Sequence, residues 1–132
     1  MVEDGVPIDG VGIQAHAMFT VPRIEPFRKF LKAISDLGLK IEITELDARL
    51  RLFDGHDDPY QAQGDFYETF VAACLENPLC SGVTIWGISD RHVWYDGIGV
   101  FKLHRPNESN LFDTEWTPKP AYQGLVNAFT KK

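Results

Sequence analysis

The stretch "IEITELDARL", residues 41–50, decides our prediction of the fold. Its β-branched and apolar residues predict a buried strand that ends on two carboxylates, Glu45 and Asp47. Side chains two residues apart on a strand face the same side, so these acids are expected to project together. By the same alternation, Glu42 is expected on the opposite face of the strand from Glu45.

Strand and helix patterns alternate three times along the chain. Strands are predicted near residues 11–16, 40–47 and 82–88. Each is followed by apolar residues at helical spacing: Phe27, Phe30, Leu31, Ile34 and Leu37; Phe66, Phe70, Val71, Cys74 and Leu75; and, after a long loop, Tyr122, Leu125, Val126 and Phe129. Thr117 and Pro118 are expected to begin the third helix, as its N-cap and first residue.

This alternation predicts an α/β fold with parallel strands, because each helix supplies the crossover that a parallel connection needs. In such folds functional residues gather beyond the carboxyl ends of the strands. Those ends read "QAH", "TELD" and "WGISD" in this chain. We therefore expect Gln14 and His16, Glu45 and Asp47, and Trp86 to converge on one patch.

The residue types at these strand ends suit carbohydrate chemistry. A histidine between two carboxylates can hold one acid ionised and oriented for attack on a developing cation. Trp86 and Trp94 offer flat apolar faces to sugar rings. Taken singly, His16 and Trp86 are more often core residues and Asp47 a loop-capping acid, but their coincidence at strand ends favours glycoside chemistry. A metal site lacks the support of a tight ligand pair such as His-x-x-x-His.

Composition narrows the function classes further. At 132 residues with 44% hydrophobic content, the chain suffices for one domain with a core. The net charge of -6, with Lys and Arg dispersed, gives no basic stripe for nucleic acid or for an anionic membrane. No apolar run approaches a membrane span, and the first residues lack the pattern of a signal peptide.

The spacing of Cys74 and Cys80 allows two interpretations. The two residues can close a short loop as a disulfide, or they can remain a pair of buried thiols. Nothing in the sequence supplies the further Cys or His ligands of a zinc site.

Four longer stretches carry a resemblance to a known family. "GVPIDGVGIQAH", "KIEITELD", "VTIWGISDRHVWYDG" and "LFDTEWTPKPAYQGL" resemble successive signatures of glycoside hydrolase family 10, the endo-β-1,4-xylanases. The resemblance implies a (β/α)8 barrel, retaining hydrolysis of xylan or xylo-oligosaccharides, no cofactor, and a secreted protein. The spacing of Cys74 and Cys80 resembles a disulfide of some secreted members, which favours that bridge here.

The resemblance also assigns roles to single residues. It implies Glu45 as the nucleophile, His16 and Asp47 as the residues that orient it, and Gln14, Trp86 and Trp94 as sugar contacts. It places residues 1–132 at about the last three strand–helix units of the barrel, as a single partial catalytic domain. The strand that carries the family's general acid/base glutamate is expected to be absent, and Asp90 is an outside candidate for that role.

Three hypotheses remain open at this point. The leading one is the nucleophile-bearing part of a retaining xylanase, whose activity as an isolated chain stays an open question. The second is a xylan-binding unit without catalysis. The third is an assembly fragment whose open sheet awaits a complementing N-terminal half or a second copy of itself.

Overall fold

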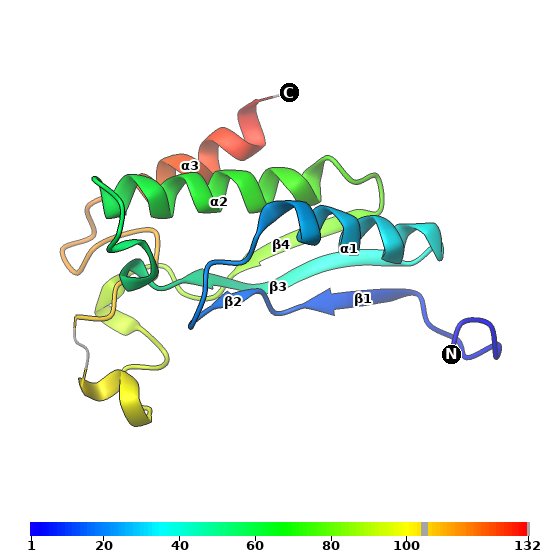
Figure 1. Ribbon diagram of the computed structural model, residues 1–132, viewed down its shortest axis with the longest axis horizontal. Helices are drawn as coiled ribbons and strands as arrows, with labels where there is room; N and C mark the ends of the chain where they lie inside the picture. Colours follow the sequence, from blue (N-terminus) through cyan, green and yellow to red (C-terminus); the bar gives the residue numbers. More distant parts are fainter. Residues whose placement is uncertain (104–105, 132) are drawn as a thin grey trace.

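The computed structural model describes residues 1–103 and 106–131, which form one parallel sheet with helices on one side (Figure 1). The strands are β1 (Gly10–Ile13), β2 (His16–Ala17), β3 (Lys40–Ala48) and β4 (Cys80–Ile85). The helices are α1 (Ile24–Asp36), α2 (Pro59–Leu75) and α3 (Pro120–Thr130), with short 3-10 helices η1 (Leu50–Phe53), η2 (Asp90–His92) and η3 (Gly99–Leu103). The predicted α/β class with three successive strand–helix units is confirmed.

β3 is the central strand of the sheet. β1 and β2 pair in parallel with one of its edges, and β4 pairs in parallel with the other. The strand predicted at 11–16 is in fact divided into β1 and β2, because Ala15 between them has a left-handed backbone with φ of 61°. β4 ends at Ile85, earlier than predicted, and the chain then turns at Gly87 with φ of 118°.

A β-bulge interrupts β3 just before its end. The register pairs Ile13 with Ile43 and His16 with Asp47 on one edge, and Ile43 with Val83 and Leu46 with Ile85 on the other. β3 therefore contains one extra residue between Ile43 and Leu46 relative to β4, and one between Ile43 and Asp47 relative to β1 and β2. Such bulges re-aim side chains, and they are common beside active sites.

The bulge decides which side chains of β3 face the helices. Ile41 and Ile43 belong to the core, and beyond the bulge Leu46 and Ala48 take their place there. Strict alternation would have continued from Ile43 to Glu45 and directed this acid into the same core. Glu45 directly precedes the core residue Leu46, so after the bulge its side chain points away from the core, toward the side of the sheet that carries Glu42. The prediction that Glu42 and Glu45 face opposite ways is wrong, since the alternation it assumed breaks at the bulge.

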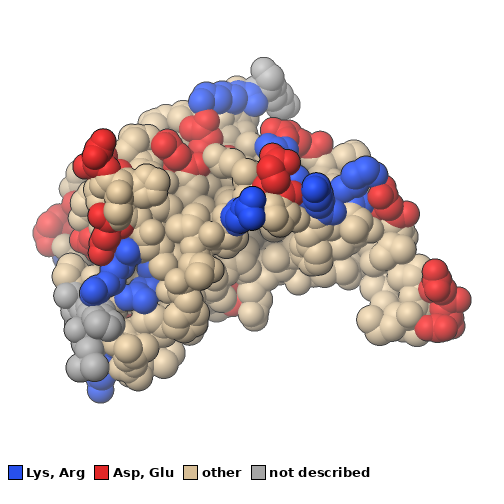
Figure 2. Space-filling model, viewed as in Figure 1, with Lys and Arg blue, Asp and Glu red and all other residues tan. Residues whose placement is uncertain are grey.

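One face of the sheet is covered and the other is open. α1 and α2 lie against the covered face, and α3 packs on the outside of α2 (Figure 1). Figure 2 shows the molecule arched over the open side, with Lys, Arg, Asp and Glu gathered mainly over the helices in this view. Among the described residues, each outer strand pairs only with β3, so both edges of the sheet carry unpaired backbone groups.

The face that α3 buries differs from the predicted one. Its buried residues are Ala121, Gly124 and Ala128, whereas Tyr122 and Phe129 are 38% and 52% exposed. A Cβ atom on Gly124 would lie 2.1 Å from the carbonyl oxygen of Gly64 on α2. The two helices cross so closely that only small residues fit between them, which leaves Tyr122 and Phe129 outside this contact, while Leu125 packs partly against the core.

Smaller differences concern the helix boundaries and margins. α3 begins at Pro120 with Lys119 as its N-cap, because Pro118 is still part of an antiparallel bridge with Phe112. The predicted start at Thr117 is therefore too early. Three residues of the predicted apolar stripes lie at exposed margins of their helices: Phe30, Leu37 and Leu75.

Candidate active site

Glu45 lies at the bulge of β3, on the open side of the sheet. The imidazole of His16, the first residue of β2, reaches both acids of the strand end: Nε2 lies 3.1 Å from Glu45 Oε2, and Nδ1 lies 3.0 Å from Asp47 Oδ1. Gln14 donates from Nε2 to Glu45 Oε1 at 3.3 Å. The left-handed turn at Ala15 separates β1 from β2 and sets His16 in register with Asp47.

The geometry of this trio limits which of its groups can donate hydrogen bonds. An ionised carboxylate only accepts hydrogen bonds, so the ring of His16 can satisfy both contacts in two ways. Either both ring nitrogens carry a proton, or one nitrogen carries a proton and one acid is protonated. Glu45 is the most exposed member of the trio, since 23% of its side chain is exposed, against 16% for His16 and 0% for Asp47.

Asp47 is the buried anchor of the site. Its side chain is fully buried, and its second oxygen, Oδ2, accepts a hydrogen bond from the indole Nε1 of Trp94 at 2.7 Å. Burial raises the pKa of Asp47 above its usual value, and the hydrogen bonds from Trp94 and His16 oppose that rise. Both carboxylate oxygens are thus occupied, and Asp47 is arranged to hold His16 in place rather than to meet a substrate.

Two indole rings flank the trio. The ring of Trp94 lies 5.1 Å from that of His16, and the ring of Trp86 lies edge-on at 6.4 Å. Trp86 and Trp94 remain 42% and 45% exposed, which leaves apolar ring surface open beside Glu45. A partly exposed carboxylate between exposed indoles can attack or stabilise a cationic sugar centre while the rings hold the sugar.

The structure brings all six predicted site residues together at the carboxyl ends of the strands. Gln14, His16, Glu45, Asp47 and Trp94 are joined by hydrogen bonds, and Trp86 joins them through its ring contact with His16. Trp94 was predicted only as a sugar contact, and its hydrogen bond to Asp47 was not predicted. No sequence signal marks that bond, since the two residues are 47 positions apart.

Asp90 does not join this group. Its Oδ2 accepts from Lys119 Nζ at 2.6 Å, and its Oδ1 accepts from the backbone N–H groups of Ser109 and Asn110 at 3.0 and 2.8 Å. It is 7% exposed, and burial raises its pKa against the opposing effect of Lys119. With both oxygens engaged inside the loop, Asp90 closes the long loop onto α3, and its consideration as a proton donor is not supported.

Cys74 and Cys80 form a disulfide in the structure, with the two sulfur atoms 2.01 Å apart. The bridge joins the end of α2 to the first residue of β4. It lies at the amino end of β4, the opposite end of the strand from the one that leads to Trp86.

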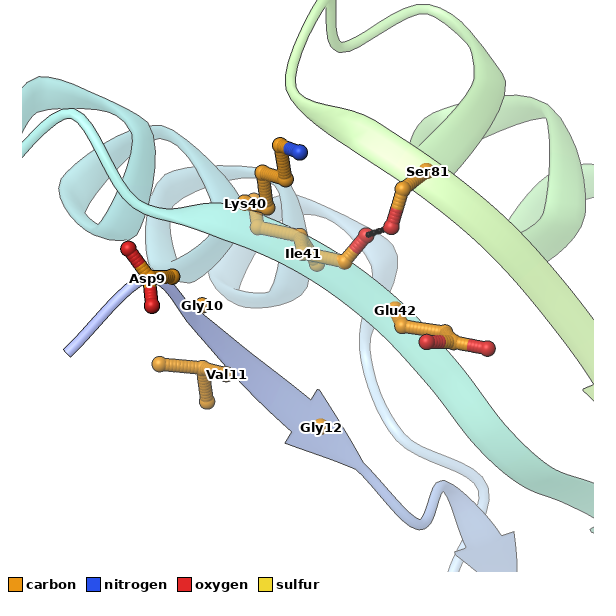
Figure 3. Close-up of a pocket in the computed structure, with 8 residues that line it drawn as sticks. All are labelled: Asp9, Gly10, Val11, Gly12, Lys40, Ile41, Glu42 and Ser81. Carbon is orange, nitrogen blue, oxygen red and sulfur yellow. Dashed lines mark hydrogen bonds between the residues drawn. The ribbon is translucent and has the colours of Figure 1, made fainter.

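A hollow of about 240 Å³ among the described residues lies away from Glu45, at the amino ends of the strands. Figure 3 shows the residues that line it, which include Asp9, Gly10, Gly12, Lys40 and Glu42. Across the part of the chain that the structure describes, no three His, Cys, Asp or Glu side chains are arranged to hold a metal ion. Within the same residues no helix has the length and apolar character needed to cross a membrane.

Comparison with known proteins gives a consistent result. Endo-1,4-beta-xylanase B of Thermotoga neapolitana is 35% identical over 130 residues, which cover 98% of this chain and 36% of that protein. Native xylanase 10B of Thermotoga maritima has a TM-score of 0.82 at 30% identity, over 98% of this chain and 39% of that one. A mutant of P. fluorescens subsp. cellulosa xylanase A in complex with xylopentaose has a TM-score of 0.80 at 35% identity, over 98% of this chain and 42% of that one.

This chain therefore spans about two fifths of the relatives that it matches. Its fold is part of a (β/α)8 barrel, about three strand–helix units of it. The family profile described as Glycosyl hydrolase family 10 matches residues 1–128. The chain belongs to glycosyl hydrolase family 10.

Proposed function

We propose that residues 1–132 are the nucleophile-bearing part of the catalytic domain of a retaining endo-β-1,4-xylanase, with Glu45 as the nucleophile. The observation that carries this proposal is the imidazole of His16, which bridges Glu45 and the buried Asp47 between two exposed indoles. The xylanase names of the relatives support xylan as the substrate. Secretion, which suits a protein with a disulfide, is part of the same proposal.

In the first step Glu45 attacks the anomeric carbon of a xylosyl unit while the bond from that carbon to the leaving oxygen breaks. The covalent xylosyl–enzyme is then cleaved by water, which restores the Glu45 carboxylate. His16 and Gln14 fix the orientation of the attacking carboxylate, and Trp86 and Trp94 hold the sugar. The leaving oxygen needs a proton from a second carboxyl, about 5 to 5.5 Å from the first.

That second carboxyl is not Asp47, because it is fully buried and both its oxygens are occupied. We propose that the acid is supplied by a complementing segment of the barrel that packs on the open sheet. The unpaired edges of the sheet and the share of each relative that this chain leaves unmatched support this partner. Self-association of this chain is the alternative occupant of the same surface.

The test of this proposal should detect attack by Glu45 in the absence of a general acid. An activated dinitrophenyl xylobioside with fluorine beside the anomeric carbon suits it, since its leaving group departs without protonation and the fluorine slows hydrolysis of the intermediate. We expect mass spectrometry to find a xylobiosyl group with one fluorine atom attached to the peptide that contains Glu45. Glu45→Gln should abolish the adduct, and Glu42→Gln, on the same face of the same strand, should retain it. An adduct on another residue would refute the assignment.

A second candidate is xylan binding without hydrolysis, favoured by the exposed rings of Trp86 and Trp94. Retention of the chain on insoluble xylan, with no adduct from the activated probe, would favour this function. Reducing-sugar release from xylan by the chain alone would instead require a proton donor within it or across a dimer.

A further inference from the structure

Arg49 is a buried cation that forms no ion pair among the described residues. It lies two positions beyond Asp47 and is 8% exposed. Its Nη1 donates to the carbonyl oxygen of Met18 at 3.4 Å, and its guanidinium carbon lies 4.6 Å from the ring centre of Phe101 and 5.8 Å from that of Tyr95. A cation over aromatic faces is attracted to them, most strongly where water is excluded.

The two rings belong to the loop that carries Trp94. Tyr95 and Phe101 form a small apolar cluster with Met18 and Val93, separate from the main core. Tyr95 is fully buried, its ring lies 5.1 Å from that of Phe101, and it meets the ring of Trp94 edge-on at 5.6 Å. A continuous series of contacts thus leads from Arg49 through Tyr95 to the indole that donates to Asp47.

We propose that Arg49 is a positioning residue for the Glu45 site. It holds Tyr95 and Phe101 against the end of β3, and this contact keeps the indole N–H of Trp94 on Asp47 and its ring beside His16. An apolar side chain of similar length would fill the space, but it would lose the attraction to both rings and the hydrogen bond to Met18. The inference rests on the proposed function of the site. Its test reads a hydrogen bond rather than sugar chemistry, so the two proposals can fail separately.

The first test substitutes Arg49→Met, which removes the charge and retains the aliphatic stem. We expect the indole N–H of Trp94 to exchange with solvent about tenfold faster, relative to the backbone N–H of Ile43 in the core, because the loop opens locally. Its nuclear magnetic resonance signal should move toward that of the exposed Trp116. Val71→Ala, a fully buried change on α2, should lower the free energy of unfolding and leave this exchange ratio unchanged.

Two further variants keep the test decisive if Arg49→Met does not fold. Phe101→Leu removes the nearer ring and should raise the exchange ratio of Trp94 in the same direction. Arg49→Lys keeps the charge but loses the planar guanidinium, so it should restore part of the protection. The proposal would be overturned if a folded Arg49→Met or Phe101→Leu variant had the same exchange ratio and the same Trp94 signal as the wild type.

Discussion

Asp47 and Asp90 are both buried aspartates that lie at or just beyond the end of a strand, yet they differ in what they contact. Burial raises the pKa of each. Asp90 faces Lys119 and two backbone N–H groups inside a closed loop. Asp47 faces His16 and the indole of Trp94, and His16 leads on to the partly exposed Glu45.

Burial and a shifted pKa therefore do not by themselves mark a catalytic acid. The partner decides the role. Lys119 pairs with Asp90 and no further group among the described residues continues the contact toward a substrate, so Asp90 holds the long loop against the start of α3. His16 has two ring nitrogens that can each hold a proton. It therefore bonds to the buried Asp47 on one side and orients Glu45, which a substrate can reach, on the other. Three variants test this difference.

Lys119→Met is expected to have the largest effect. It leaves Asp90 buried without its cation, and breaking a buried pair in this way costs about 3–5 kcal/mol of unfolding free energy. Chemical denaturation at neutral pH measures the loss, which should shrink as the pH falls and Asp90 takes up a proton. Lys131→Met, which removes an exposed pair with Glu68, is the control and should change stability little. Equal effects of the two variants would show that the Asp90 pair does not fasten the loop.

Trp94→Phe should have an intermediate effect. It removes the donor to Asp47 Oδ2 and leaves a buried acceptor unpaired, at a cost of about 1–3 kcal/mol. The pKa of Asp47 should rise further, since the lost hydrogen bond lowers it in the wild type. Denaturation and titration of the Asp47 carboxyl carbon by nuclear magnetic resonance measure the two effects. Trp116→Phe makes the same change at a 52% exposed position, and a loss as large in that control would contradict the expectation.

Asp47→Asn should have the smallest effect on stability, and the effect should depend on pH. Because the pKa of Asp47 is raised on folding, the folded state binds more protons than the unfolded state between the ordinary value, 3.8, and the raised one. Within that window the wild type loses stability as the pH rises, by at most about 1.4 kcal/mol per pH unit.

The asparagine variant lacks this loss, so the stability of the wild type minus that of Asp47→Asn should decrease as the pH rises from 3.8. Other carboxyls, such as Glu68 and Glu76 with lowered pKa values, act in both proteins and cancel in the difference. Denaturation of both proteins over a pH series gives the result. If the stability difference between the two proteins stays constant or increases with pH, burial does not determine the direction of the pKa shift of Asp47.

Much of the architecture was predictable because it depends on local patterns. The alternation of apolar runs predicted three strand–helix units, and the shared polarity of the strand ends predicted that Gln14, His16 and Glu45 would meet. The helical pattern failed in part at α3, where Gly124 meets the backbone of α2, so that Ala121 and Gly124 are buried and Tyr122 is exposed. Large apolar residues predict burial only when the neighbouring element leaves room for them.

Residue types and their spacing along the chain were enough to predict the class of fold, the family and the residues that gather around Glu45. The direction in which Glu45 points depends instead on the register of the sheet. The extra residue in β3 appears as a bulge only against the registers of its two neighbours, and it alone turns Glu45 from the helix side to the open side. Likewise, Asp47 and Asp90 differ because of their partners, Trp94 and Lys119, which lie 47 and 29 positions away along the chain. Helix and strand patterns extend over only a few residues, so they do not predict such pairs.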